Sequence, residues 1–238
     1  MKRLLSKFKT FLRLFSAEIK GLFGLDVTDK GERVFIKCGN FNYDKMDIYQ
    51  KTHYQRYLFS QKYINKGDII GDMACGTGYG SIMLGERAKK VVALDVNKKV
   101  IDKISKEYKE FTNVEFLNQD LLNLSIHEWL DKIVSFETLE HLSLNDIERV
   151  LLNFNHVLKD GGYLIFSTPF MQEDSDTAIK MGFHKVFNIN EEVLRTWLYK
   201  SGFEIKDFFY QNYQDFTVEK EKAIKDFIIG IAEKINNQ

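Results

Sequence analysis

The chain has 238 residues, of which 44% are hydrophobic and 29% are charged, a composition typical of a soluble globular protein. Basic and acidic residues both number 34, so the chain lacks the basic excess of a dedicated nucleic-acid-binding protein. The two cysteines, Cys38 and Cys75, have no metal-ligand spacing, which predicts a reducing, cytoplasmic location rather than a disulfide framework.

Residues 1–24 differ from the rest in charge. They hold six basic residues and one acidic residue, a net charge of +5. Apolar residues recur between the bases at helical spacing, which predicts a basic amphipathic helix. Such a helix lies on an anionic membrane surface, docks on a partner protein or packs on its own domain, and the sequence leaves these alternatives open. On the first alternative, the protein is peripheral on the inner face of the membrane.

Residues 25–66 form a second predicted region, a helical cap or lid. Its clearest part is "IYQKTHYQRYLFSQKYI", an aromatic-rich helix that leads into the first strand. His53, Arg56 and Tyr57 are lid candidates, although packing explains these three residues equally well.

Residues 67–238 form the predicted core, in which short apolar runs alternate with helical patterns. The runs predict strands at 68–74, 91–95, 113–119, 132–136, 162–168 and 203–210. The helical patterns cover 79–88, 97–109, 145–158 and 190–201. The segment 227–234 is either a seventh strand or the end of a helix that begins near residue 218. This alternation predicts an α/β fold with a doubly wound, parallel sheet, whose ligands bind at the carboxyl ends of the strands.

The helix at 145–158 has the clearest boundaries. Ile147, Val150, Leu151, Phe154 and Val157 line one face. Asn145 followed by Glu148 predicts a capping box at its start, and Gly161 predicts its C-terminal stop.

A glycine-rich stretch, "GDMACGTGYGS" at 71–81, follows the first predicted strand. No lysine follows the glycines, which excludes an ATP-binding P-loop. A dinucleotide fingerprint would need Ser81 as its third small residue, an imperfect match. Asp72 would repel a diphosphate but attract a cation, and Asp95 ends the second strand, where a carboxylate can accept both hydroxyls of a ribose.

The combination resembles the class I S-adenosylmethionine-dependent methyltransferases, whose motif is acidic-x-Gly-x-Gly-x-Gly. Here Asp72-Met-Ala74-Cys-Gly76-Thr77-Gly78 matches it, with alanine at the first glycine. The resemblance implies a Rossmann-like, seven-stranded, mostly parallel sheet with strand order 3-2-1-4-5-7-6 and strand 7 antiparallel. It also implies S-adenosylmethionine as the cofactor.

The same resemblance implies cofactor-binding roles. Asp72 helps to hold the amino group, and the loop from Ala74 through Gly76, Thr77 and Gly78 passes under the aminoacyl arm. Asp95 takes the ribose hydroxyls. Further along the chain, the cofactor contacts are Asp120 and Leu121, beside the adenine, and Phe136 at the end of the fourth strand.

"FETLEHL" follows the fourth strand and offers groups for chemistry. A sugar hydroxyl is a poor nucleophile at neutral pH and needs a base or a metal ion. Glu137, Glu140 and His141 would share one face of a helical turn, which suits Mg²⁺ or Mn²⁺. E-x-x-E-H is similar to the metal motif of small-RNA 2′-O-methyltransferases and of ubiquinone-pathway O-methyltransferases. By that resemblance His184, placed after the fifth strand, completes the metal site.

A metal-free alternative stays open beside the metal site. In it His141 or His184 acts as the base, and Glu137 is a third catalytic candidate. A purely structural role for this segment is also open.

The acceptor is predicted from resemblance as well. "HYQRYLFSQKYI", "DMACGTGYGS", "SFETLEHL" and "FSTP", in that order, resemble methyltransferases of bacterial surface-glycan loci. They imply O-methylation of a nucleotide-sugar or glycan, and thus a role in glycan or capsule biosynthesis. Quinone-like small molecules and RNA ribose are the alternative acceptors. DNA is not expected, because no D/N-P-P-Y/F motif follows the fourth strand. A non-catalytic scaffold that retains the cofactor is the alternative of another class.

Overall fold

The computed structural model describes residues 34, 36, 42–175, 182 and 184–235. Contacts divide the chain into Met1–Val34 and Phe35–Gln238, and the second unit holds both α2 and the sheet. The predicted helix at 1–24 and Cys38 lie outside the described residues, as does the start of the predicted cap at residue 25.

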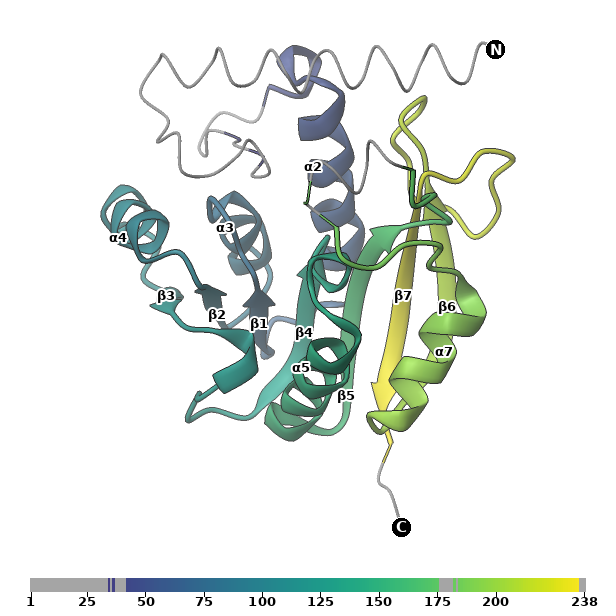
Figure 1. Cartoon of the computed structure of the whole chain (residues 1–238). Coiled ribbons are helices and arrows are strands. Elements are labelled where there is room, and N and C mark those ends of the chain that lie inside the picture. Colours follow the sequence, from purple (N-terminus) through teal and green to yellow (C-terminus); the bar gives the residue numbers. More distant parts are fainter. Residues whose placement is uncertain (1–33, 35, 37–41, 176–181, 183, 236–238) are drawn as a thin grey trace. The chain divides into compact units, whose positions relative to one another are not determined.

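Within the described residues, seven strands form one sheet with the order β3-β2-β1-β4-β5-β7-β6 (Figure 1). Strand β7 runs antiparallel to both of its neighbours, and the other pairs are parallel. The predicted sheet is therefore confirmed, and the alternative of a helix at 227–234 is wrong. The strands are β1 (Ile69–Met73), β2 (Lys90–Asp95), β3 (Val114–Asn118), β4 (Leu130–Phe136), β5 (Leu158–Pro169), β6 (Phe203–Gln211) and β7 (Phe227–Lys234).

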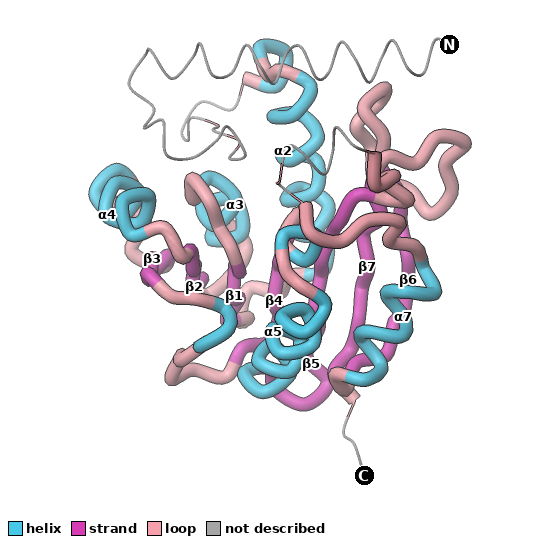
Figure 2. The backbone as a smooth tube through the Cα atoms, viewed as in Figure 1, coloured by secondary structure: helices cyan, strands magenta, loops and turns pink. Residues whose placement is uncertain are grey.

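Helices connect most of the parallel strands, as the tube in Figure 2 shows. The α-helices are α2 (Ile48–Ser60), α3 (Tyr79–Gly85), α4 (Lys98–Glu107), α5 (Leu144–Val157) and α7 (Glu191–Lys200), and the short 3₁₀-helices are η3 (Tyr43–Lys45), η4 (Gln61–Tyr63), η5 (Leu121–Asn123) and η6 (Leu139–His141). Helices α5 and α7 lie together on one face of the sheet (Figure 1), while α2 packs against α3.

Helix α5 differs from the prediction at both ends. Its N-cap is Ser143, whose hydroxyl accepts a hydrogen bond from the backbone N–H of Asp146 at 3.3 Å. The predicted capping box at Asn145 is therefore wrong, because Ser143 fills this role first. Gly161 does not end the helix either: Leu158 already pairs with Leu130 of β4, and Gly161, at φ 69°, lies inside β5.

The predicted apolar face of α5 is confirmed. Ile147, Val150, Leu151, Phe154 and Val157 are all buried in the core cluster. This face packs in the same cluster as apolar residues of β4 and β5. Strand β1 pairs in parallel with both β2 and β4, so the carboxyl ends of these three strands lie side by side, and Asp72 pairs with Ala93 and with Val134.

Candidate functional site

The loop between β1 and α3 has an unusual backbone. Ala74, Gly76 and Gly78 have φ values of 63°, 55° and 77°. Glycine adopts this region freely, whereas alanine is strained there. A Cβ on Gly78 would also lie 2.9 Å from the ring of Phe116. The loop can therefore bring bare backbone close to a ligand, and it carries strain at Ala74.

Asp95 ties the end of β2 to this loop. Its Oδ2 accepts from the N–H of Gly76 at 3.1 Å, and its Oδ1 accepts from the N–H of Asn97 at 2.8 Å. The side chain is buried. The structure thus places Asp95 directly beside Gly76, and its role in binding a ribose stays a prediction.

Asp72, near the end of β1, is completely buried. Its Oδ2 accepts from the Ser81 hydroxyl at 2.6 Å, and its Oδ1 accepts from the Tyr57 hydroxyl at 3.2 Å. Burial raises the pKa of Asp72 to about 7, although these two hydrogen bonds oppose the shift. These two hydrogen bonds connect Asp72 on β1 to Tyr57 on α2 and to Ser81 on α3. The contact of Asp72 with the cofactor amino group stays a prediction.

The remaining predicted cofactor residues lie at the same edge of the sheet. Asp120 is exposed and caps η5, where its side chain accepts from the N–H of Leu122 at 2.9 Å. Leu121 and Thr77 are half-buried. Phe136 is buried, and its ring meets the Tyr57 ring edge-on at 5.0 Å between centroids. These residues therefore lie near the carboxyl ends of the strands, and their contacts with the cofactor stay predictions.

Glu137 follows β4 directly and has a strained backbone, with φ 50°. Its N–H donates to the carbonyl of Ser167 at 3.1 Å, and the Ser167 hydroxyl donates to its Oε1 at 2.7 Å. Strain of this kind persists where surrounding contacts impose it and is concentrated at functional sites. The neighbouring strand β5 therefore fixes the direction of the Glu137 carboxylate.

The second partner of Glu137 comes from α2. The Nη1 atom of Arg56 lies 3.1 Å from Glu137 Oε1, and its Nε donates to Gln211 Oε1 at 2.8 Å. The guanidinium also stacks on the ring of Phe227, 4.0 Å from its centroid. The sequence singles out Arg56 as a lid candidate only, because nothing in its local pattern indicates partners just after β4 and on β6 and β7.

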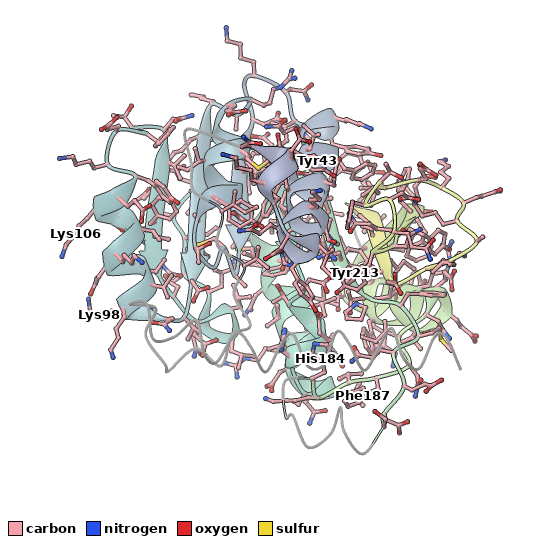
Figure 3. All side chains as sticks on the ribbon, turned by 90° about the horizontal axis from the view of Figure 1, so that it is seen from above. Tyr43, Lys98, Lys106, His184, Phe187 and Tyr213 are labelled. Atoms are coloured by element: carbon pink, nitrogen blue, oxygen red, sulfur yellow. The ribbon has the colours of Figure 1, made fainter. Side chains whose placement is uncertain are left out.

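Glu140, His141 and His184 form a cluster on η6 and the segment after β5. One ligand atom from each lies within 4.8 Å of the others, and the two imidazole rings are 5.0 Å apart between centroids. The N–H of Lys185 donates to the Glu140 carbonyl at 2.7 Å, which holds the two segments together. Figure 3 shows His184 close to Phe187, as seen from above the view of Figure 1. The structure therefore brings together three of the four predicted metal ligands, and Glu137 is not part of this cluster.

The environment of the cluster changes its protonation. Burial and the nearby Glu137 charge raise the pKa of Glu140 well above its ordinary value. Burial, with a smaller contribution from His141, lowers the pKa of His184 to about 4. Neither Glu140 oxygen makes a hydrogen bond within the described part of the chain. A buried glutamic acid beside a neutral imidazole can take part in a proton transfer, and it can bind a cation once it has lost its proton.

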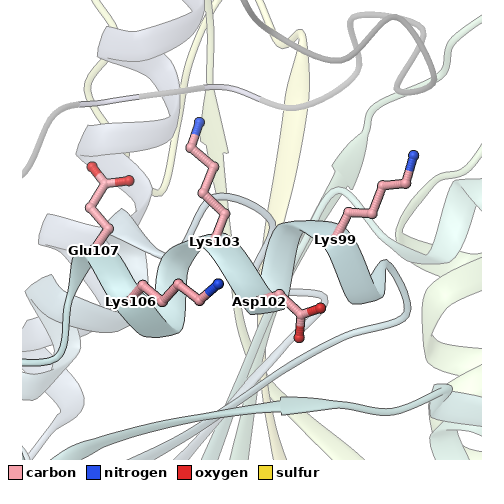
Figure 4. Close-up of a pocket in the computed structure, with 5 residues that line it drawn as sticks. All are labelled: Lys99, Asp102, Lys103, Lys106 and Glu107. Carbon is pink, nitrogen blue, oxygen red and sulfur yellow. The ribbon is translucent and has the colours of Figure 1, made fainter.

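A separate hollow runs along α4 and does not belong to this site. Five side chains of that helix line it (Figure 4): Lys99, Asp102, Lys103, Lys106 and Glu107. No predicted site residue is among them.

Comparisons with known proteins agree with the geometry. Residues 70–162 match a family model described as a methyltransferase domain. A malonyl-[acyl-carrier protein] O-methyltransferase of Bacillus anthracis is 32% identical over 137 residues, covering 56% of this chain and 49% of that protein. An uncharacterized protein of Methanocaldococcus jannaschii is 30% identical over 179 residues, covering 66% of this chain and 67% of that protein. The chain belongs to the class I S-adenosylmethionine-dependent methyltransferases.

Solved structures show the same fold. The N-methyltransferase NodS of Bradyrhizobium japonicum, in complex with S-adenosyl-L-homocysteine, has a TM-score of 0.62 and 18% identity; the match covers 84% of this chain and 94% of that chain. The matches to the first curated relatives cover only about half of their length, 49% and 54%. Within its described residues, none of the helices is both long and apolar enough to cross a bilayer.

Proposed function

We propose that this methyltransferase moves the methyl group of S-adenosylmethionine to a hydroxyl oxygen, and that the acceptor is a sugar hydroxyl of a nucleotide-sugar or surface glycan. The observation that carries the proposal is the cluster of Glu140, His141 and His184 beside Glu137 at the carboxyl end of β4. A hydroxyl acceptor needs such groups, whereas a strong nucleophile needs only alignment with the methyl group.

The described residues fit the cofactor. In the loop after β1, Gly76 and Gly78 expose backbone without side chains, and Asp95 lies next to Gly76. When bound, the cofactor supplies a methyl group on a positively charged sulfur with a neutral leaving group. The protein then aligns the acceptor and removes its proton. We assign hydrogen bonding of the acceptor hydroxyl to Glu137 and proton acceptance to His141, because the lowered pKa of His184, about 4, makes His184 the weaker base of the two histidines.

A metal-assisted form of the same reaction is the second candidate. Glu140, His141 and His184 would hold a divalent cation such as Mg²⁺ or Mn²⁺, which would act as a Lewis acid on the acceptor oxygen. The observation that favours it is the pair of Glu140 oxygens, buried without a hydrogen-bond partner in the described residues. Glu137 stays a fourth ligand candidate.

A methyl-transfer screen tests the proposal. Purified protein is incubated with S-adenosylmethionine labelled in the methyl group and with nucleotide-sugars, quinone precursors, short RNAs or a malonyl thioester. We expect label on a sugar hydroxyl. Label on one of the other acceptors instead would refute the sugar assignment, and cofactor binding without any transfer would favour a non-catalytic scaffold.

We also propose a cytoplasmic location with peripheral contact, to a membrane or a partner protein, through residues 1–24. The support is the basic, amphipathic pattern of that segment. Co-sedimentation with vesicles containing anionic lipid should fall strongly on deletion of residues 1–24. Equal sedimentation of both proteins would refute the membrane contact.

A further inference from the structure

Gln172 lies just after β5, and its side chain contacts His184. The Oε1 atom of Gln172 lies 2.7 Å from Nδ1 of His184, and both side chains are half-buried. An amide oxygen can only accept a hydrogen bond, so Nδ1 carries the proton that this bond needs. In a neutral imidazole the other nitrogen, Nε2, then keeps the lone pair. Gln172 therefore selects which nitrogen of His184 is able to bind a cation.

Backbone hydrogen bonds hold Gln172 in this position. Its carbonyl accepts from the N–H of Asn188 at 2.8 Å, and the N–H of Met171 donates to the carbonyl of Ile189 at 2.8 Å. Met171 and Asn188 have φ values of 49° and 56°, a region that is strained for residues other than glycine and persists where surrounding contacts impose it. The segments that carry Gln172 and His184 are therefore tied together independently of their side chains.

The residue after His184 is tied to η6 as well. The N–H of Lys185 donates to the carbonyl of Glu140 at 2.7 Å, and the His184 ring lies 5.0 Å from that of His141 between centroids. Both carboxyl oxygens of Glu140 are buried without a hydrogen-bond partner in the described part of the chain, so this group can still accept one. A histidine whose second nitrogen donates to a fixed oxygen is the arrangement by which proteins orient an imidazole toward a metal ion.

We propose that Gln172 is a positioning residue, which keeps the proton of His184 on Nδ1 so that Nε2 can bind a divalent cation together with Glu140 and His141. This inference rests on the metal-assisted form of the proposed function and adds to it a residue that acts on the ion only through His184. Without the Gln172 oxygen, the imidazole could turn about its side-chain bonds or carry its proton on Nε2. In either case its lone pair would not be directed at the ion.

Nuclear magnetic resonance of the metal-free protein tests which nitrogen carries the proton. Nitrogen shifts of isotopically labelled histidine report it at about pH 8, and loss of signals in His184→Ala assigns them. We expect the proton on Nδ1 in wild type and in Gln172→Glu, whose carboxylate is also an acceptor. In Gln172→Met, which has no such acceptor, at least part of the proton should move to Nε2. A proton on Nε2 in wild type would overturn the inference without any Gln172 variant.

Calorimetric titration with Mn²⁺ alone tests the effect on the cation. Gln172→Met should weaken Mn²⁺ binding by about 10- to 100-fold, the usual effect of removing the partner of a histidine ligand. Gln172→Glu should bind Mn²⁺ no more than about threefold more weakly than wild type. Gln214→Met, at an exposed glutamine between β6 and β7, is the matched control and should bind as wild type does.

The two measurements together separate the possible failures. Unchanged Mn²⁺ binding by Gln172→Met would overturn the inference. Weaker binding by Gln172→Met with the proton still on Nδ1 would overturn it too and leave a packing role for Gln172. A wild-type protein that keeps the proton of His184 on Nδ1 but binds no Mn²⁺ would instead overturn the metal-assisted reaction itself.

Discussion

The hydroxyl of Tyr57 donates to Asp72 at 3.2 Å, and the Tyr57 ring lies where a side chain on Gly80 would have to sit. Tyr57 of α2 thus contacts residues on both sides of the loop that follows β1. Its neighbour Arg56 reaches the residue that follows β4. Two consecutive residues of α2 therefore touch the carboxyl ends of the two strands that flank the switch point.

Tyr57→Phe removes the donor to Asp72. We expect a loss of about 1–2 kcal/mol in unfolding free energy at pH 8, because a buried acceptor loses its partner. The loss should be smaller at pH 5.5, since this hydrogen bond stabilises the ionised form of Asp72. Urea unfolding at both pH values measures it. Tyr199→Phe, at an exposed tyrosine on α7, is the control; an equal loss in the two variants would contradict the prediction.

Asp72 should make the stability of the cofactor-free protein depend on pH. Burial raises its pKa from 3.8 to about 7, so the folded state keeps a proton that the unfolded state releases. Stability is therefore fully present below pH 4 and declines toward pH 7, by at most about 4 kcal/mol. Asp72→Asn should abolish this decline.

The measurement for Asp72 is the difference in unfolding free energy between Asp72→Asn and wild type at several pH values. The difference should move in favour of the variant as pH rises from 4 to 7. Asp160→Asn, at an exposed residue, controls for the loss of one negative charge. A constant difference across this range would show that Asp72 ionises normally in the folded protein.

Gly80→Ala should destabilise the protein by about 1–3 kcal/mol, because the new Cβ would lie 2.0 Å from Cζ of Tyr57. Gly67→Ala is the matched control, since nothing lies within 4 Å of its new Cβ. Thermal unfolding compares them. In a Tyr57→Ala background the same Gly80→Ala change should become neutral or stabilising, because alanine favours a helix. If it stays destabilising there, Tyr57 is not the cause.

Ala74→Gly should stabilise the protein by about 1 kcal/mol, because glycine adopts the observed φ of 63° without strain. Ala93→Gly, inside β2, should instead destabilise it, since glycine weakens a strand interior. Chemical denaturation should therefore give changes in unfolding free energy of opposite sign for the two variants, relative to wild type. A loss of stability in Ala74→Gly would argue against strain at this position.

If the metal-assisted reaction is correct, Mn²⁺ should bind to the protein even when neither the cofactor nor the methyl acceptor is present. His184→Ala should weaken binding at least tenfold, since even indirect support of a metal ligand is worth about 10- to 100-fold. Electron paramagnetic resonance of Mn²⁺ measures the free ion, and His156→Ala on the exposed side of α5 is the control. Full methyl transfer in the presence of a chelator would refute a role for the metal.

Sequence patterns predicted the sheet well and the ends of elements less well. Hydrophobic periodicity is repeated over many residues, so the apolar face of α5 and the alternation of strands and helices were clear. A helix cap depends on one side chain, and Ser143 and Asn145 are two acceptable caps within three residues. The segment 227–234 is a strand because it pairs with β5 and β6 on either side. These neighbours cannot be predicted from the sequence of the segment alone.

The candidate site shows the same division. Glu140 and His141 are neighbours in a short motif, so their proximity could be predicted, and resemblance added His184. The ion pair of Arg56 and Glu137 joins residues 81 positions apart, and the bond from Arg56 to Gln211 spans 155. No local pattern reports such contacts, because they arise only once α2 packs across the sheet.

The place of β7 has a consequence for how the protein is made. This strand is the last of the described strands in the chain, yet it lies between β5 and β6. Until a ribosome releases residues 227–234, β5 and β6 each present an open edge to other nascent chains, and such edges invite aggregation. We expect stalled synthesis before residue 227 to leave a chaperone-dependent intermediate, and rapid protection of β5 once the final strand inserts.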